Sequence, residues 1–514
     1  ALRFTPDGGC ISIELSRTDA GYVYVAIRDT GSGIPEEQIA RLFTRHCPDI
    51  KFGDNTNCNA GLGLSVVKHI VELHGRDVSL TALTGDVITE RSVTRHEVTF
   101  GNRHNIQDFA DSAARIETAN NLSINAGRDV ANLGGVFDAR GEIDISAARD
   151  VTIASVEERL LEERGKKYLN SQVIQHGANV SAGRDIEISA GRDLAAVGSR
   201  IDAQRDISLA AGRDMTLASA ANEEHFYSKT KTGGKRVIRQ EDQVRQQATE
   251  VSAKGDVRLS ANDNMVLSAS RVAAGGEAYL VAGEQLALLA AEDLDYSLYD
   301  MKKKGSWGSK KTQRDEITTV TNVGSTITSG GDLTLLSGSD QTYQRAHLES
   351  GEDLTLVSGG QINFEGVKDL EQESHEKSDS GFVWTSAKGK GNTDETLRQS
   401  VLLAQGEVVI KAVDGLKIDI KQINQQSVTQ TIDAMVQADP QLAWLKEAEL
   451  RGDVDWRRVK EIHESFKYEH SGLGGGAAII IAIVLSVITA GAGTAIAAAA
   501  GGAVGGGTVG AVVG

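Results

Sequence analysis

Between about residues 115 and 430, short runs of alternating apolar and polar residues recur every 21 positions. The runs, such as IEI, ISL, LTL and VRL, hold three to five residues and predict short strands. Small polar corners such as SAGRD, SGGD and SGED separate them. The pairs at this spacing are Leu122–Ile143, Ile124–Ile145, Ile186–Ile207, Ile188–Leu209, Leu194–Met215, Leu333–Leu354, Leu335–Leu356, Asp129–Asp150, Asp185–Asp206, Asp193–Asp214, Asp332–Asp353 and Asp256–Glu277.

Strands this short cannot bury a core alone, but stacking each turn on the next buries their apolar side chains and pairs their backbones. We therefore predict a mainly β fold: a right-handed parallel β-helix with about 21 residues per turn. Eight to twelve turns, each advancing about 4.8 Å, give a rod of roughly 40–60 Å.

Four charged segments interrupt the repeat: 155–172, 222–248, 295–322 and 366–400. Such insertions are predicted to be loops or hairpins extruded from the rod. The last of them carries Phe382 and Trp384. These aromatic residues indicate either packing within a local hairpin or a contact with a receptor.

The corner aspartates have three interpretations. They cap turns by accepting backbone N–H groups, they bind a metal, or they form a ladder that binds carbohydrate. The 21-residue period differs from the nine-residue calcium-binding repeat, so turn capping is favoured and no metal site is predicted. An arginine often precedes the aspartate, and we expect these arginines to be solvated: Arg128, Arg149, Arg184, Arg192, Arg205 and Arg213.

The region after the repeat changes character. Residues 431–470 have Leu, Glu, Lys and Trp at helix-like spacing, which predicts a helical bridge. Residues 471–514 carry no charge, and the stretch from Ala477 to Ala500 is apolar and long enough to cross a bilayer. We expect residues 477–500 to insert into or contact a membrane; the alternative is a hairpin packed against a further domain.

Residues 1–100 have a different pattern. The alternation in CISIELSRTDAGYVYVAIRD predicts two strands joined at Asp19–Gly21, the second ending at Asp29. Gly31 and Gly33 follow, and GLGLSVVKHIVELHG places a glycine turn before an amphipathic helix. A turn of this kind holds phosphate through free N–H groups and the helix dipole.

Composition changes where the pattern changes. All three cysteines and three of the four prolines precede residue 60, so the chain reads as two segments of different origin joined near residue 100. Gene rearrangement, a gene-prediction error or an assembly error would each produce such a join. Three cysteines give no disulfide framework. The formal net charge of −17 argues against a nucleic-acid partner. ALRFTPDGG has no signal-peptide pattern.

The motifs FTPDGG, DTGSGIP, LF and GLGLSVVKHIVELHGR resemble the ATP-binding domain of sensor histidine kinases, over about 80 residues. The resemblance implies that Asp29 bonds the adenine amino group and that Gly31 and Gly33 shape the adenine edge. It also implies that Phe43 lies in the lid and that Gly61 and Gly63 face the phosphates, with ATP and Mg²⁺ as ligands.

This resemblance is incomplete. The magnesium-binding Asn of the family would precede Ala1, the phosphorylated-His helices would lie further upstream, and Asn59–Ala60 replaces the usual glycine pair. We therefore expect a non-functional remnant without phosphotransfer. His69 and His74 are five apart and share no helix face, so they are expected to be ordinary surface residues.

The repeats SAGRDIEISAGRDLAAVGSRIDAQRDISLAAGRDMTLASA and GSTITSGGDLTLLSGSDQTYQRAHLESGEDLTLVSGGQINFEG resemble filamentous haemagglutinin and the exoproteins of contact-dependent growth inhibition. The resemblance implies secretion by an outer-membrane two-partner transporter to the bacterial surface. It implies adhesion to a receptor, or toxin delivery to a neighbouring bacterium, without catalysis. The alternative is a kinase remnant that still binds nucleotide.

These readings divide the chain into four parts: 1–100, 101–430, 431–470 and 471–514.

Overall fold

The computed structural model describes residues 11–17, 23–29, 77–306, 309–381, 384–423, 426–452 and 454–473. The chain divides into two units, residues 1–74 and 75–514. In the first unit, β1 (Ile11–Arg17) and β2 (Val23–Asp29) pair antiparallel, with Ile11 opposite Asp29 and Arg17 opposite Val23. The predicted strand pair is therefore confirmed.

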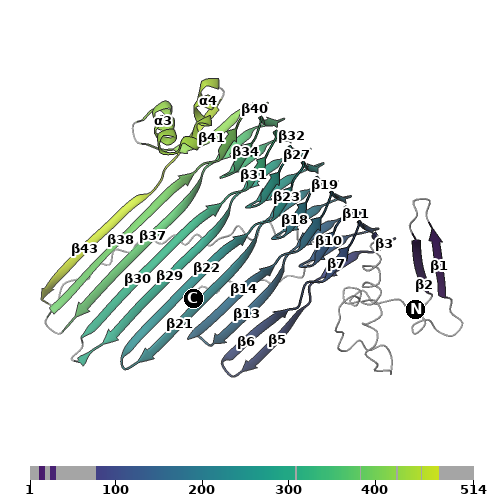
Figure 1. Ribbon diagram of the computed structural model, residues 1–514. Coiled ribbons are helices and arrows are strands. Elements are labelled where there is room, and N and C mark those ends of the chain that lie inside the picture. Colours follow the sequence, from purple (N-terminus) through teal and green to yellow (C-terminus); the bar gives the residue numbers. More distant parts are fainter. Residues whose placement is uncertain are drawn as a thin grey trace. The chain divides into compact units, whose positions relative to one another are not determined.

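In the second unit the chain winds into a coil with three faces, each a parallel sheet (Figure 1). Face 1 contains β7 (Arg115–Thr118), β10 (Val136–Ala139), β15 (Asn179–Ala182), β18 (Arg200–Ala203), β23 (Glu250–Ala253), β26 (Arg271–Ala274), β31 (Thr326–Ser329), β34 (His347–Ser350) and β39 (Val401–Ala404). Face 2 contains β3 (Val78–Ala82), β8 (Leu122–Ala126), β11 (Ile143–Ala147), β16 (Ile186–Ala190), β19 (Ile207–Ala211), β24 (Val257–Ala261), β27 (Ala278–Ala282), β32 (Leu333–Ser337), β35 (Leu354–Ser358) and β40 (Val408–Ala412). Face 3 contains β4 (Val87–Glu90), β9 (Val130–Leu133), β12 (Val151–Ala154), β17 (Leu194–Val197), β20 (Met215–Ala218), β25 (Met265–Ser268), β28 (Leu286–Leu289), β33 (Gln341–Gln344), β36 (Ile362–Glu365), β41 (Leu416–Lys421) and β42 (Val454–Val459).

The strands of each face alternate buried and outward-facing residues, as the sequence pattern predicts. Leu122 pairs with Ile143 of the next coil, and both side chains are fully buried. Ile143 pairs in turn with Ile186, because a hairpin between these coils lengthens the spacing. The parallel β-helix is thus confirmed, and one continuous apolar core runs through the coil. Residues 21 apart pair only where no hairpin intervenes.

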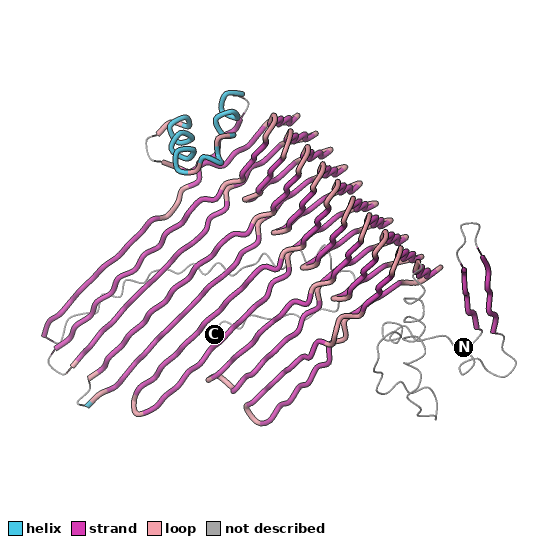
Figure 2. The backbone as a smooth tube through the Cα atoms, in the orientation of Figure 1, coloured by secondary structure: helices cyan, strands magenta, loops and turns pink. Residues whose placement is uncertain are grey.

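The insertions form a fourth sheet, antiparallel and eleven strands wide, which we call the hairpin sheet (Figure 2). The sequence predicted four of the five hairpins individually, but not the β5–β6 hairpin, the strand β43, or their union into a sheet. In spatial order from one edge to the other, the strands are β5 (Val93–Phe100), β6 (Arg103–Ala110), β13 (Val156–Arg164), β14 (Tyr168–His176), β21 (Ala220–Thr232), β22 (Lys235–Gln247), β29 (Ala291–Lys304), β30 (Lys310–Val323), β37 (Val367–Ser380), β38 (Trp384–Arg398) and β43 (His463–Leu473).

A geometric match explains why the hairpins join. A hairpin leaves the coil after the first, third, fifth, seventh and ninth strands of face 3, so two coils separate successive hairpins. Neighbouring strands lie about 4.8 Å apart, so two coils advance about 9.6 Å, which is the width of one two-stranded hairpin. Each hairpin therefore fills the space up to the next, and the sheet has no gap.

The coil ends under two short helices. The helix α3 (Val428–Ala438) begins with a capping box between Ser427 and Gln430. It is followed by η2 (Pro440–Leu442) and α4 (Trp444–Arg451). Trp444 is buried against Phe364, with ring centroids 4.8 Å apart, so the helices cover the apolar interior of the last coil.

Two sequence expectations differ from the structure. The predicted helical bridge at 431–470 is helical only up to Arg451; the rest forms β42 and β43, because it pairs with β41 and β38. The first strand of the coil begins at Val78, so residues 78–100 belong to the coil unit rather than to the N-terminal segment. In the described part of the chain, no helix has the length and apolar character that crossing a membrane requires. Residues 477–500 lie outside the described residues.

Candidate functional site

The corner carboxylates stack from coil to coil. Asp185 accepts the backbone N–H of Asp206 at 3.1 Å, and Asp206 accepts that of Asp256 at 2.8 Å. Each carboxylate therefore satisfies a backbone donor one coil further on, so these residues accept backbone N–H groups as predicted, but between coils rather than within their own turn. The other aspartates with this bond are Asp77, Asp86, Asp129, Asp150, Asp193, Asp214, Asp256, Asp332, Asp340 and Asp353.

The corner arginines are half-exposed, but they are not simply solvated as the sequence led us to expect. The guanidinium of Arg149 binds the carboxylate of Asp129, one coil earlier, with Nε 3.0 Å from Oδ1. The same kind of pair joins Arg128 to Asp86, Arg184 to Glu142, Arg192 to Asp150, Arg205 to Asp185 and Arg213 to Asp193. The arginines are solvent-exposed as expected, but the ion pairs were not predicted, because stacked coils bring residues about 20 or 42 positions apart into contact.

These bonds bear on the other interpretations of the corners. The carboxylates and guanidiniums engage each other, so they do not offer a free polar ladder to a carbohydrate. Among the residues that the structure describes, no group of three or more His, Cys, Asp or Glu side chains is placed to hold a metal ion. The corners are therefore structural, and the exposed faces of the hairpin sheet are the better candidate for function.

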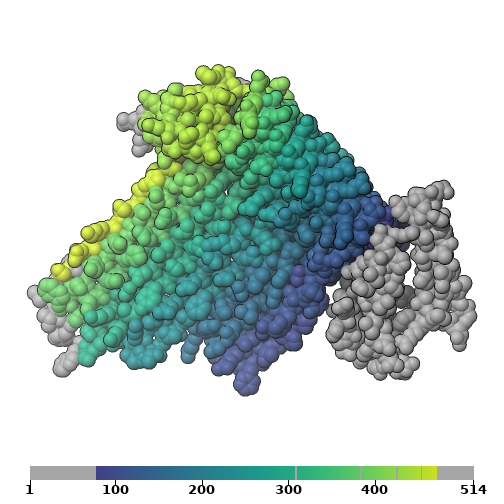
Figure 3. All heavy atoms as spheres, in the orientation of Figure 1, coloured from purple at the N-terminus to yellow at the C-terminus, as the bar shows by residue number. Residues whose placement is uncertain are grey.

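The hairpin sheet extends beyond the coil as a broad face running from β5 to β43 (Figure 3). Most of its side chains are partly or fully exposed. A single-layer sheet with so little buried apolar surface must be held by its ladders and cross-strand pairs. One such pair is Tyr168 on β14 and Phe226 on β21, whose rings meet edge to face with centroids 5.8 Å apart.

We call the boundary between two neighbouring hairpins a seam. Near the coil, four seams each contain a hydrogen bond from a backbone N–H of one hairpin to a side-chain oxygen of the next. The backbone N–H of Gln175 donates to Asn222 Oδ1 at 2.7 Å, where the regular ladder between β14 and β21 stops. The equivalent bonds are Gln246 N–H to Asp293 (2.8 Å), Asn322 N–H to Asp369 (2.8 Å) and Leu397 N–H to Glu461 (2.7 Å). The hairpins are therefore fixed at their bases.

Asp369 shows how such a buried carboxylate stays charged. Burial raises its pKa, but the hydrogen bonds from Asn322 and the guanidinium of Arg398 outweigh burial, so the pKa lies below its usual value. Arg345 adds a contact at 3.2 Å. Because these groups come from three separate parts of the chain, the seam ties the hairpins to the coil.

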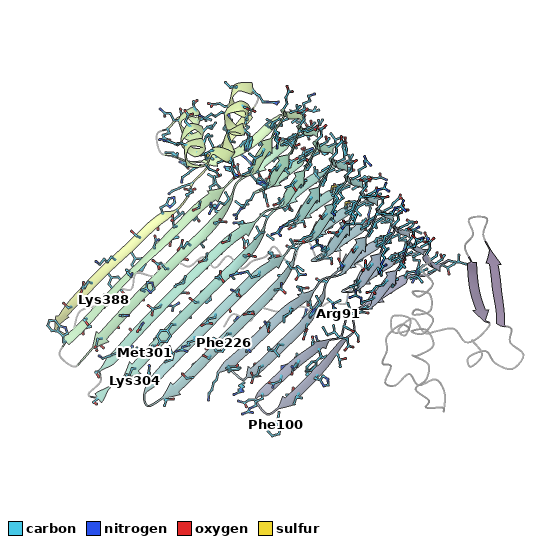
Figure 4. The ribbon with its side chains drawn as sticks, viewed as in Figure 1. Arg91, Phe100, Phe226, Met301, Lys304 and Lys388 are labelled. Carbon is cyan, nitrogen blue, oxygen red and sulfur yellow. The ribbon has the colours of Figure 1, made fainter. Side chains whose placement is uncertain are left out.

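The far ends of three hairpins form a strongly basic surface, which we call the distal edge: residues 228–239, 299–315 and 375–390. It holds 14 lysine and arginine residues against four acidic residues, a formal charge of +10 in a chain of −17. Lys304 and Lys388 lie on it in Figure 4, far from Arg91 near the coil. Its eleven exposed lysines are Lys229, Lys231, Lys235, Lys302, Lys303, Lys304, Lys310, Lys311, Lys377, Lys388 and Lys390.

Two ends of the hairpin sheet carry exposed aromatic residues, one of them on the distal edge. Phe100, at the tip of the β5–β6 hairpin, is 81% exposed, and Trp384, at the start of β38, is 55% exposed. Trp384 is therefore more than half exposed, and both predictions for it, packing in its hairpin or contact with a receptor, stay open. Phe382 lies outside the described residues. Exposed aromatic residues are enriched where proteins bind partners, and a cluster of positive charge attracts anionic partners.

Two open grooves also accompany the hairpin sheet. A groove of about 810 Å³ lies where face 1 meets the hairpin bases, lined by polar groups that include Asp202, Glu250, Arg271 and Gln246. A second, of about 420 Å³, lies on the sheet itself around His225. Both grooves are open to solvent, and neither is deep enough to surround a small molecule.

The second groove has the composition of a hydrolytic triad but not its geometry. Ser171, His225 and Asp242 lie side by side on three adjacent strands, and His225 Nδ1 hydrogen-bonds Asp242. No hydrogen bond joins Ser171 to His225 within the described residues, and the neighbouring backbone donors are used in the sheet. Without an activated nucleophile and free N–H groups for an oxyanion, this row is not expected to hydrolyse a substrate.

The N-terminal candidate site is described only at one residue. Asp29 ends β2, as predicted. Gly31, Gly33, Phe43, Gly61 and Gly63 lie outside the described residues, as do His69 and His74. The structure therefore leaves the nucleotide-binding roles of these residues as predictions.

Sequence reasoning missed the distal edge, although a signal was present. The runs KTKTGGKR and MKKKGSWGSKK place lysines around glycine turns, where hairpins reverse. Their clustering depends on the registration of neighbouring hairpins, which the local sequence does not reveal.

Comparisons with known proteins agree with the two-part reading. A family described as "Histidine kinase-, DNA gyrase B-, and HSP90-like ATPase" matches residues 1–101. The family described as "Hemagglutinin repeat" matches residues 162–238, 233–308 and 305–406. Both resemblances inferred from the sequence are therefore confirmed. No solved structure matches the chain.

Three curated relatives are sensor kinases that match fewer than 100 residues of this chain. Sensor histidine kinase TmoS of Ectopseudomonas mendocina is 38% identical over 85 residues, which cover 16% of this chain and 9% of the relative. Adaptive-response sensory kinase SasA of Synechococcus sp. (strain CC9311) is 42% identical over 77 residues, 15% and 19% of the two chains. Sensor protein CreC of Escherichia coli (strain K12) is 33% identical over 97 residues, 19% and 20%. The chain thus spans at most a fifth of these relatives.

Proposed function

We propose that residues 75–473 form a surface module of a secreted, filamentous haemagglutinin-like protein, which acts in adhesion or in contact-dependent toxin delivery. The coil is the scaffold, and the distal edge of the hairpin sheet contacts an anionic cell-surface receptor or neighbouring bacterium. The observation that carries this proposal is the charge of +10 gathered on exposed hairpin ends, in a chain whose net charge is −17.

Physical considerations support a binding role for the distal edge. Like charges placed together repel one another, so their clustering destabilises the isolated sheet unless a partner neutralises it. The nine lysines at residues 229–377 are exposed and stand on adjacent hairpins that the seams hold in register. A preorganised row of this kind binds an extended anionic surface without paying much ordering entropy.

The hemagglutinin repeats support a secreted or surface location and, in the parent protein, export by an outer-membrane two-partner transporter. We further propose that residues 477–500 contact a membrane, since an uncharged stretch of this length partitions favourably.

The test compares the full chain with a variant that carries Lys302→Gln, Lys303→Gln and Lys304→Gln. Binding to intact bacterial cells is measured by flow cytometry over a range of salt. We expect at least a tenfold loss of affinity for the variant, and a weaker salt dependence. The matched control replaces three lysines of the coil, Lys254, Lys411 and Lys417, by glutamine. Equal loss in both variants, or salt-independent binding by the native chain, would contradict the proposal.

A second candidate function is nucleotide binding by residues 1–101. It is favoured by the family match and by the pairing of β1 with β2, which ends at Asp29. Titration of the chain with ATP, with and without Mg²⁺, tests it. Saturable binding that Asp29→Asn abolishes supports residual affinity, and no binding at millimolar ATP retires it.

A further inference from the structure

The last strand of the hairpin sheet is half of a hairpin. The strand β43 follows β42, the eleventh strand of face 3, just as each earlier hairpin follows an odd-numbered strand of that face. Every earlier outgoing strand pairs with a returning strand of its own hairpin. Within the described residues β43 pairs only with β38, so its other edge presents unpaired N–H and C=O groups along eleven residues.

Natural sheets protect such edges, because an unpaired strand is a template for pairing with another chain. The free edge of β43 contains no proline. It also carries an electrostatic imbalance. Lys467 lies directly opposite Lys390 of β38, and neither lysine forms an ion pair with any residue that the structure describes. Like charges at directly opposed positions destabilise a sheet, so this pair lacks a carboxylate.

We propose that the free edge of β43 binds the β43 of a second copy of this chain, forming a two-fold symmetric dimer with one continuous sheet. The strands run antiparallel, and Tyr468 lies on the axis opposite Tyr468 of the other copy. In this register Lys467 of each copy lies opposite Glu469 of the other. Lys467 of each copy thereby gains the carboxylate that its own chain does not supply.

The direction of the strands excludes the other simple arrangement. β43 and β5 both run away from the coil, because each follows a strand of face 3. If copies stacked head to tail, β5 of one copy would therefore lie parallel to β43 of the next, whereas every seam of the hairpin sheet is antiparallel. In addition, α3 and α4 cover the coil end on which the next coil would stack. A two-fold axis at β43 requires neither a parallel seam nor an open coil end.

The side chains of β43 suit a fixed docking strand. Phe466 and Tyr468 stack with ring centroids 6.4 Å apart. Their rings lie over Gly391 and Gly389 of β38, where an added Cβ would come within 2.1 Å of Phe466 and 2.5 Å of Tyr468. Aromatic rings that cover glycines in a neighbouring strand fix its register. The edge is thus ordered before a second copy arrives.

Disulfide trapping tests the register in the full chain, after Cys10, Cys47 and Cys58 are replaced by serine. Residues directly opposite each other in an antiparallel pair have Cα atoms about 4.5–5.5 Å apart, within disulfide range. Tyr468→Cys is expected to crosslink with itself under mild oxidation. Ser465→Cys and Ser471→Cys are expected not to crosslink alone but to do so when mixed, because 465 lies opposite 471. His96→Cys on β5 is the control for the other free edge.

Charge exchange tests the chemistry by sedimentation and light scattering. Lys467→Glu places two glutamates opposite each other and is expected to weaken dimerisation at least tenfold. The double variant Lys467→Glu, Glu469→Lys restores opposite charges and is expected to recover most of the affinity. Circular dichroism confirms that each variant is folded. A native chain that remains monomeric at its highest soluble concentration overturns the proposal. Crosslinking through His96→Cys in place of Tyr468→Cys, or a dimer indifferent to Lys467→Glu, also overturns it.

Discussion

Asp150 and Arg192 are 42 residues apart in sequence, yet Arg192 Nε donates a hydrogen bond to Asp150 Oδ1 at 3.0 Å. The same oxygen accepts the backbone N–H of Asp193 at 3.3 Å. A whole hairpin, β13–β14, lies between the two residues along the chain. These hydrogen bonds join the coil before the hairpin to the coil after it. A hairpin can therefore be inserted between two coils without weakening their contact.

This contact predicts a loss of stability in acid. The guanidinium of Arg192 lowers the pKa of Asp150 below its usual value. A depressed folded pKa stabilises the protein fully above the unfolded value near pH 3.9, and that contribution is lost as pH falls through the lower folded value. Asp150→Asn is expected to lower the free energy of unfolding by about 1 kcal/mol at pH 7. This difference between the native chain and the variant should shrink below about pH 4.

The measurement is denaturant unfolding of the native chain and Asp150→Asn at several pH values. Asp138→Asn, on the outer side of face 1 and outside the corner ladder, is the matched control. A gap between the native chain and Asp150→Asn that stays constant from pH 7 to pH 3 would refute the role of the ion pair.

A histidine in the hairpin sheet predicts the opposite pH dependence. The hydrogen bond to Asp242 raises the pKa of His225 above its usual value. A histidine whose pKa is higher in the folded state stabilises the protein fully at pH values below its unfolded pKa near 6.5. That stabilisation is lost as the pH rises through the higher pKa of the folded state. The β21–β22 hairpin should therefore exchange its amides faster at pH 8 than at pH 6, after correction for intrinsic exchange.

NMR of the histidine rings provides the direct check. We expect the resonance assigned through His225→Gln to titrate above pH 6.5, and Asp242→Asn to bring the midpoint back down. A midpoint that Asp242→Asn leaves unchanged would show that the aspartate does not hold the charge.

Sequence reasoning succeeded where burial is periodic and failed where it is not. The apolar residues at Leu122 and Ile143 predict the coil because the two side chains stack on each other and are fully buried. In the hairpin sheet most side chains are partly exposed on both faces, so the strands show little alternation of apolar and polar residues. Phe466 and Tyr468 have charged neighbours in the sequence, and the pattern of this segment therefore resembles that of a helix. The sequence pattern located the bounds of four hairpins to within a few residues. It did not predict that neighbouring hairpins pair with each other, because that pairing depends on the rise of two coils.

The candidate site followed the same division. The corner aspartates were recognised as acceptors of backbone N–H groups because Asp at a tight turn has a local chemical reason to accept them. The pairing of Arg149 with Asp129 follows from stacking of coils, and the distal edge follows from registration of separate hairpins. Contacts of this kind are properties of the assembled fold.

The corners without hairpins require a left-handed backbone. Gly134, Gly198, Ala269 and Arg345 occupy equivalent places after face 3, with φ between 44° and 61°. At Gly198 an added Cβ would also lie 2.6 Å from the Cβ of Ala220. Gly198→Ala is expected to destabilise the chain by at least about 1 kcal/mol. Gly85→Ala is the control, because nothing lies within 4 Å of its added Cβ. Equal thermal midpoints for both variants would contradict this reading.

The match between hairpin width and coil rise predicts the effect of removing one hairpin. Deleting residues 220–247 leaves a corner that connects face 3 directly to face 1, as the chain already does after β9 and β17. The coil should therefore keep its core. The hairpin sheet should not close, because β14 and β29 would be left about 9.6 Å further apart than a normal seam. Hydrogen exchange by mass spectrometry is expected to show protection retained in β19 and β24 but lost along the exposed edges of β14 and β29. The control is a deletion of only the tip, residues 229–238, which shortens the hairpin but leaves both seams near the coil. If β14 and β29 remained protected after the full deletion, the sheet would have closed the gap, and the two-coil rule would not govern its assembly.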